Sequence, residues 1–135
     1  HRALLDLNRD LNHLYRENPA LHAGDTDPAG FAWIDLHNGD QSVFAFLRRS
    51  PLHPDRPPLL CVFNCTPVPR EAYWLGVPAT GTYRKVLDTD AARYGGSGFN
   101  QQERVVTQLA PCQGYPCHIR LDLPPLGALF FELAD

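Results

Sequence analysis

Two prolines one residue apart, Pro67 and Pro69, constrain this chain more than any other feature. Each proline lacks a backbone N–H and holds φ at about −65°, so the pair can lie neither inside a helix nor in a paired central strand. The segment that contains them, 66–70, reads Thr-Pro-Val-Pro-Arg and follows an apolar run at 59–64. We therefore expect a rigid corner between two strands here, with no chemistry of its own.

Apolar and polar residues alternate with period two over much of the chain after residue 30, which is typical of half-buried strands. The segment 37–40 contains Asn-Gly, which favours a hairpin turn, and the loop 51–58 contains four prolines. The run at 59–63 is apolar throughout and indicates a strand covered on both faces. Seven or eight short strands separated by turns predict a mainly β fold, an antiparallel β-sandwich. The expected strands are 31–36, 42–48, 59–63, 73–77, 83–87, 105–109, 118–123 and 126–133.

One amphipathic helix is expected before the strands. Over 3–17, Leu4, Leu7, Leu11 and Leu14 fall three and four residues apart and form one apolar stripe. Asn18-Pro19 should end the helix. We therefore expect a helix in 1–18 and a β-sandwich domain in 19–135. An isolated helix of this length is marginal in water, so the stripe should pack on the β-domain or on a part of a longer parent protein.

Composition bounds the possible partners. The formal net charge is −3 and there is no basic patch, so a nucleic acid is not an expected partner. No apolar stretch approaches the ~18 residues that a membrane span requires, and no secretory signal pattern opens the chain. Neither a membrane nor a secretory route is therefore expected. Methionine is absent, so we expect a fragment of a longer polypeptide or a processed product, with the active residues elsewhere.

The four cysteines do not match a metal-binding pattern. Cys61 and Cys65 lie on an extended segment, too far apart for a disulfide while that strand stays straight. Cys112 and Cys117 flank a turn that could close a disulfide, whereas a zinc site would need shorter spacing or matched histidines. We expect free thiols in a reducing cytoplasm, with a Cys112–Cys117 disulfide as the alternative. No metal or cofactor is expected.

Candidate catalytic groups are present but do not assemble. Asp88 and Asp90 could form a glycosidase pair, yet two carboxylates at a strand end more often hydrogen-bond nearby backbone amides in a turn. The six histidines lack the spacing of a helical metal site and are expected on the solvated surface. The glycine-rich segment 94–98 lacks the lysine of a phosphate-binding loop and is expected to be a flexible surface loop. We assign no catalytic residue to this chain.

Aromatic side chains are the better candidates for binding, because a tryptophan ring can lie against the flat C–H face of a sugar. In the first strand, Ala32, Ile34 and Leu36 form an aliphatic face, which places Trp33 on the opposite face with Phe31 and Asp35. If the aliphatic face is core, Trp33 is exposed, and a large exposed aromatic calls for an explanation. The alternative is that Trp33 packs under the helix or the proline-rich loop. For Trp74, packing in the core or in an interface is expected.

Six segments, taken in order, resemble one protein family. The segment 66–77 reads Thr-Pro-Val-Pro-Arg-x-x-Tyr-x-x-Gly-Val, and 1–16 has the outline of a terminal barrel helix; the others are 27–33, 42–49, 86–98 and 123–129. Together they resemble the C-terminal β-domain of bacterial 1,4-α-glucan (glycogen) branching enzymes of the α-amylase superfamily, preceded by the last helix of the catalytic barrel. The chain departs from the family pattern at Cys65, where phenylalanine is usual, at Asp88, where asparagine is common, and over 99–102.

The resemblance implies a Greek-key sandwich and a parent enzyme that cuts α-1,4 links and forms α-1,6 branches. The catalytic aspartate and glutamate of such enzymes lie on the barrel and have no counterpart here, so this chain alone should be inactive. The implied partners are the barrel and, weakly, an α-1,4-glucan such as glycogen or amylose, with Trp33 as the candidate contact. The alternatives are an autonomous α-glucan-binding module, the tail of another amylase-family enzyme such as a maltosyltransferase, or a purely structural domain.

Overall fold

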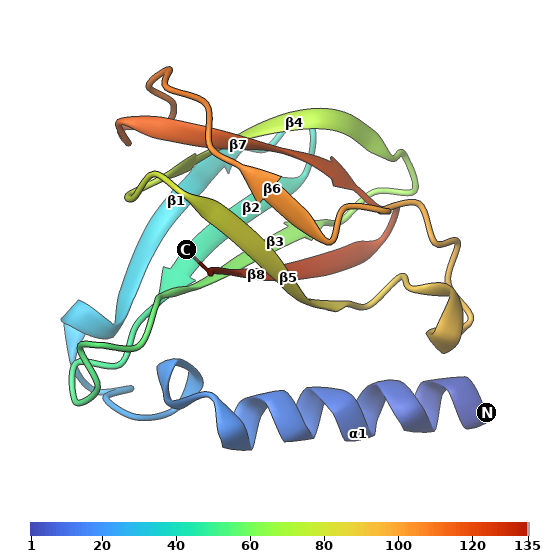
Figure 1. The fold of residues 1–135 in the computed structure, drawn as a ribbon. Helices are drawn as coiled ribbons and strands as arrows, with labels where there is room; N and C mark the ends of the chain where they lie inside the picture. The colour runs from blue at the N-terminus through green and yellow to red at the C-terminus, as the bar shows by residue number, and fades with distance from the viewer. Residues whose placement is uncertain (135) are drawn as a thin grey trace.

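One α-helix, α1 (Arg2–Glu17), precedes eight strands in the computed structural model, which describes residues 1–134 (Figure 1). Both the helix and the number of strands agree with the sequence-based expectation. Three short 3-10 helices lie in the connections: η1 (Pro19–Leu21), η2 (Pro28–Gly30) and η3 (Ala92–Tyr94). The strands are β1 (Phe31–Asn38), β2 (Val43–Arg48), β3 (Leu59–Asn64), β4 (Arg70–Val77), β5 (Thr82–Asp88), β6 (Arg104–Val106), β7 (Cys117–Leu123) and β8 (Gly127–Leu133).

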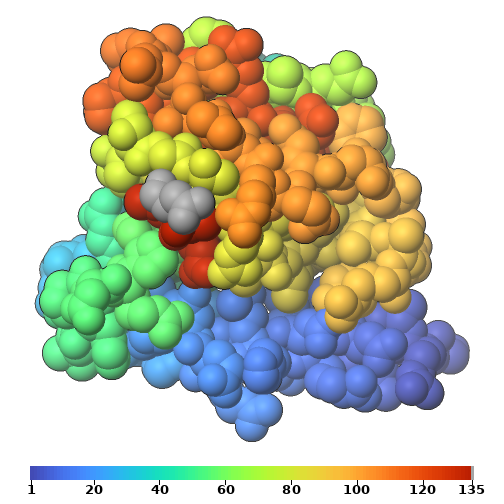
Figure 2. All heavy atoms as spheres, in the orientation of Figure 1, coloured from blue at the N-terminus to red at the C-terminus, as the bar shows by residue number. Residues whose placement is uncertain are grey.

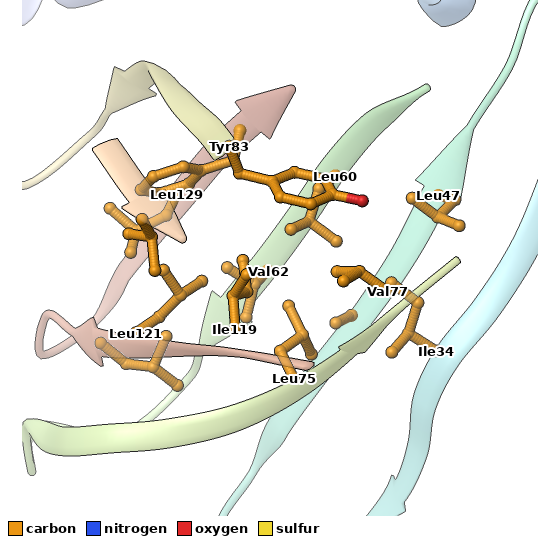
Figure 3. Packing of buried hydrophobic residues seen from close by; sticks show 14 of the residues in the cluster. Ile34, Leu47, Leu60, Val62, Leu75, Val77, Tyr83, Ile119, Leu121 and Leu129 are labelled. Carbon is orange, nitrogen blue, oxygen red and sulfur yellow. The ribbon is translucent and has the colours of Figure 1, made fainter. Parts of the chain in front are cut away.

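The strands form two layers, which confirms the antiparallel sandwich. Six of them make one sheet in the order β1-β2-β3-β8-β5-β6, and β4 and β7 pair as a two-stranded sheet across it (Figure 1). Every strand pair is antiparallel. The hydrophobic core fills the space between the layers, as Figure 3 shows. It contains Ile34, Leu47, Leu60, Val62, Leu75, Val77, Ile119, Leu121 and Leu129, among others.

The proline corner carries the chain from the larger sheet to the smaller one. It links the end of β3 to the start of β4, as expected from Pro67 and Pro69. Asn64, which is 2% exposed, fastens it: its Nδ2 donates to the carbonyl oxygens of Val68 (2.8 Å) and Pro124 (3.0 Å). The corner between β3 and β4 is thereby hydrogen-bonded to the turn between β7 and β8. Both of these connections join the larger sheet to the smaller one.

The six-stranded sheet is also covered in part on the side away from the core, which we call its outer face. Strand β3 is buried on both faces, as predicted: Leu60 and Val62 point to the core, while Leu59 and Cys61 join a second cluster with Ala20 of η1. Figure 2 shows α1 and the segment after it lying along this side of the β-domain. Phe46, Phe63 and Phe130 continue the outer face as partly buried aromatics.

Helix α1 is fastened to the β-domain at η3. The Tyr94 hydroxyl donates to Asp10 Oδ2 (2.5 Å), and the Arg93 guanidinium pairs with the same carboxylate. Leu7, Leu11 and Leu14 of the predicted apolar stripe are half-buried, whereas Leu4 is 61% exposed. Part of the stripe therefore packs on the β-domain, and its first turn remains uncovered in this chain.

Strand β1 does not keep the alternation that its sequence predicts. Its pairing with β2 shifts register between Trp33 and Asp35, a β-bulge that leaves both Ile34 and Asp35 buried. Beyond the bulge Leu36 is 48% exposed. The expectation that Leu36 shares the core face and Asp35 faces solvent is therefore wrong. The hairpin itself is confirmed, with Asn38 as the last strand residue and the turn at 39–42.

Candidate functional site

Trp33 lies on the outer face near the free edge of the larger sheet and is 47% exposed. Its indole packs nearly perpendicular to Phe31, at 5.0 Å between ring centroids, and to Phe46, at 6.0 Å. These two phenylalanines stack on each other at 5.0 Å. Their contacts fix the orientation of the indole while almost half of the residue stays open to solvent. The structure thus favours an exposed Trp33 over one covered by the helix or the proline-rich loop.

A hollow of about 380 Å³ opens beside Trp33 at the end of the β1–β2 hairpin. Trp33, Leu36, Val43 and Phe44 give it apolar walls, and Asn38, Gly39, Ser42 and Cys65 complete the lining. Ser42 contributes a hydroxyl to this lining, and Asn38 contributes an amide whose two N–H groups already donate to Gln41 and Tyr73, which leaves its carbonyl oxygen as an acceptor. Apolar walls with a few polar groups are typical of sites for small organic ligands. Such a combination can hold the C–H face of a sugar ring while its hydroxyls reach the polar groups.

A partly buried polar network around the buried Asp35 fixes the strand that carries Trp33. Asp35 accepts hydrogen bonds from the hydroxyl of Tyr73 on β4 and from Gln113 Nε2 (3.0 Å). Asn38 Nδ2 donates to the Tyr73 hydroxyl oxygen (2.5 Å). Burial, followed by the hydrogen bond to Asp35, raises the pKa of Tyr73 well above that of a free phenol. The network therefore ties the bulge of β1 to the smaller sheet through a neutral tyrosine.

The second tryptophan, Trp74, is not in the core. It is 44% exposed on the solvent face of the two-stranded sheet, where its indole stacks on the His118 imidazole at 4.0 Å and 11°. The Arg120 guanidinium carbon lies 4.7 Å from the centre of the same indole. His118 is fully buried, with Nδ1 bonded to the carbonyl oxygen of Ala110 (2.8 Å). The expectation of a solvated His118 is therefore wrong, and of the two kinds of packing expected for Trp74 only an interface remains open.

The two aspartates form a turn, as predicted. Asp88 Oδ1 accepts from the backbone N–H of Asp90 (2.8 Å), and Asp90 Oδ1 accepts from the backbone N–H of Ser97 (3.1 Å). Burial raises the pKa of the Asp88 carboxyl. The glycine-rich segment is thereby hydrogen-bonded to the end of β5. The side chains of Asp88 and Asp90 are thus occupied by hydrogen bonds of this turn.

All four cysteines are free thiols in the structure, which agrees with the favoured expectation rather than a Cys112–Cys117 disulfide. Cys61 is buried, and its burial raises the pKa of the thiol to about 12. Within residues 1–134, no three histidine, cysteine or acidic side chains gather closely enough to hold a metal ion. No helix among the described residues is both long and apolar enough to cross a membrane.

The polar network and the His118 stack were not found from the sequence. Asp35 and Gln113 are 78 residues apart, and only the fold brings them together. The sequence indicates that Trp74 and His118 lie on strands, because both stand next to residues of strong β propensity. It contains no pattern that predicts the contact between them across two strands.

Comparison with known proteins places this geometry in a family. The family model described as "Alpha amylase, C-terminal all-beta domain" matches residues 33–134. The 1,4-alpha-glucan branching enzyme of Thiobacillus denitrificans is 45% identical over 131 residues, which cover 97% of this chain and 17% of that protein. The enzyme of the same name from Cupriavidus necator is 47% identical over 129 residues, 96% of this chain and 17% of the relative.

A third relative with this name, from Marinobacter nauticus, is 40% identical over 134 residues, 99% of this chain and 21% of the relative. The chain thus spans about a fifth of the length of the curated relatives that it matches. The family match covers every strand from β2 to β8 and begins at Trp33 itself. With its helix-plus-sandwich architecture, this chain belongs to the α-amylase C-terminal all-β domain family.

Proposed function

We propose that this chain is the non-catalytic C-terminal domain of a 1,4-α-glucan branching enzyme, in which it packs on the catalytic barrel and contacts the glucan. The observation that carries the proposal is the 40–47% identity, over nearly the whole chain, to three proteins of that name. The parent activity is the transfer of an α-1,4-linked chain to a 6-hydroxyl group, which serves glycogen synthesis. The free cysteines fit a reducing cytoplasm as the place of that activity.

The uncovered side of α1 is the surface proposed to face the barrel. Leu4 and Leu5 are 61% and 57% exposed, and Tyr15 is 51% exposed, on a helix that has no fully buried residue. A helix that leaves several large apolar side chains in water gains stability when a further layer covers them. The relative from Marinobacter nauticus is some five times longer than this chain, so its remaining polypeptide is long enough to provide such a layer.

Trp33 is proposed as the glucan contact. Its indole is exposed, is held by Phe31 and Phe46, and adjoins a hollow whose lining includes the Asn38 and Ser42 side chains. An orientation fixed by packing lowers the conformational entropy that the indole loses when a ligand binds. The hollow is open to solvent and contacts a ligand from one side, so the expected binding is weak and exchanges fast. An α-1,4-glucan presents both features that the surface matches: apolar ring faces and hydroxyl edges.

Affinity electrophoresis in gels that contain amylose or glycogen tests this contact. Trp33→Ala should raise the dissociation constant about tenfold, ~1.4 kcal/mol, which is the size of one aromatic stacking contact. Trp33→Phe should retain part of the retardation, because a flat ring remains. Leu52→Ala is the matched control, since Leu52 is also an exposed large apolar residue, 74% exposed, on the proline-rich loop. Equal retardation of wild type and Trp33→Ala refutes the contact.

A further inference from the structure

We propose that Trp74, His118 and Arg120 form a second sugar-binding platform, on the face of the sandwich opposite to Trp33, and that it takes one ring of an α-glucan chain. The inference rests on the proposed function for the class of its ligand. It concerns different residues and a different sheet, so each can fail without the other. The three side chains are named the β4–β7 platform below.

One face of the Trp74 indole is free for a ligand. The imidazole of His118 stacks on the indole at 4.0 Å, and the Arg120 guanidinium lies 4.7 Å from its centre. Arg120 Nε also donates to His118 Nε2 at 3.3 Å. If the two groups lay on opposite faces of the indole, the two stacking distances together would separate them far beyond a hydrogen bond. Both therefore lie on the same face, and the opposite face accounts for the 44% exposure of Trp74.

The sheet holds this indole in place from below. The buried imidazole of His118 is fixed by the Ala110 carbonyl through Nδ1 and by Arg120 through Nε2, so His118 cannot rotate away from the stack. Position 76 requires glycine, because a Cβ atom there would lie 2.2 Å from the carbonyl oxygen of Cys112. An aromatic surface whose orientation is already fixed loses little entropy when a ring binds to it.

A β-bulge in β4 re-aims Trp74 toward solvent. The pairing of β4 with β7 shifts register between Arg70 and Tyr73, and Ala72 in that bulge has φ 49°. Left-handed backbone is costly for a residue with a side chain, and it persists only where the surroundings enforce it. Here Asp122 Oδ1 accepts the Ala72 N–H (2.9 Å). The bulge sends Tyr73 to Asp35 beneath the sheet and leaves Trp74 on the solvent face.

The polar groups beside the indole favour a neutral polyol over an anionic ligand. Arg120 is exposed and offers guanidinium N–H donors, while the half-buried carboxylate of Asp122, two residues along the same face of β7, offers acceptors. Sugar hydroxyls need both kinds of partner. A phosphate would be drawn to Arg120 but repelled by Asp122, so a nucleotide is disfavoured although its base could stack on the indole.

Ligand binding at Trp33 and at the β4–β7 platform can be measured separately by fluorescence, because the chain contains only two tryptophans. In Trp33→Phe all tryptophan fluorescence comes from Trp74, and in Trp74→Phe it comes from Trp33. Maltoheptaose should change the fluorescence of Trp33→Phe saturably, with a dissociation constant in the millimolar range, and cellohexaose should bind at least fivefold more weakly. Arg120→Ala in the Trp33→Phe background should weaken the maltoheptaose response at least threefold, since it removes the donor and loosens the stack.

No maltoheptaose response in Trp33→Phe overturns the β4–β7 platform, and the response of Trp74→Phe then decides the proposed Trp33 contact independently. A tighter response to ADP than to maltoheptaose in Trp33→Phe also overturns it, in favour of a nucleotide. As a second measurement that keeps Trp33 intact, Trp74→Ala should reduce retardation of the chain in amylose gels. Retardation equal to that of the wild type contradicts the platform even if the Trp33→Phe variant does not fold.

Discussion

Asn64 gives the sharpest test of how the proline corner holds the two sheets together. Its side chain makes four hydrogen bonds while being 2% exposed. Nδ2 donates to the carbonyl oxygens of Val68 (2.8 Å) and Pro124 (3.0 Å), and Oδ1 accepts from the backbone N–H (3.2 Å) and the hydroxyl (2.9 Å) of Thr66. No aliphatic side chain can replace any of the four.

Asn64→Ala should therefore cost about 3–4 kcal/mol of unfolding free energy, at about 1 kcal/mol net for each hydrogen bond. That is a large share of the ~5–15 kcal/mol that stabilises a typical domain. The assay is urea unfolding followed by far-UV circular dichroism, with the free energy extrapolated to water. Asn8→Ala is the matched control, since Asn8 is exposed on α1 and its loss should change stability by less than ~0.5 kcal/mol. A cost below ~1 kcal/mol for Asn64→Ala, with an unchanged denaturant slope, would show that these four hydrogen bonds do not stabilise the corner.

Two further predictions concern the turn after β5 and the catalytic competence of the chain. Because burial raises the pKa of Asp88, ionisation favours the unfolded state, and stability is lost as the pH rises through the raised pKa. Asp88→Asn keeps the acceptor for the Asp90 N–H, so the variant should be more stable than wild type at pH 7. This gain should vanish below about pH 4, where the carboxyl is protonated in both states. Urea unfolding midpoints at both pH values check this, and a gain of the same size at both would contradict it. The purified chain should leave the iodine absorbance of amylose unchanged, because it carries no expected catalytic residue, whereas a steady fall would show that it has branching activity.

The strands were predictable because their signals are local. Alternation and turn residues located all eight, and Pro67 and Pro69 located the point where the chain changes sheets. The pairing of β3 with β8 was not readable in this way, because it joins segments more than sixty residues apart and depends on the whole core. The division into six strands and two strands follows from that pairing.

The sequence predicts the candidate site only as far as regular alternation along a strand predicts which face a side chain occupies. Trp33 was placed on the outer face because its neighbours Ala32 and Ile34 mark the core side, and it lies there. Leu36 was misplaced because the bulge of β1 is held by Tyr73 and Gln113, which come from distant strands and loops. The burial of His118 under Trp74 was not predictable for a related reason, since stacking across β4 and β7 depends on register and leaves no periodic pattern in the sequence.

The proposed contact between Trp33 and α-glucan can be followed in the indole N–H signals of the two tryptophans. In a nitrogen-15 correlation spectrum the chain has one indole N–H signal for each tryptophan, assigned with Trp33→Phe and Trp74→Phe. During titration with maltoheptaose, the Trp33 signal should shift progressively and saturate, and an equal concentration of cellohexaose should leave it nearly in place. A Trp33 signal that stays fixed throughout the maltoheptaose titration would contradict a contact between Trp33 and the glucan.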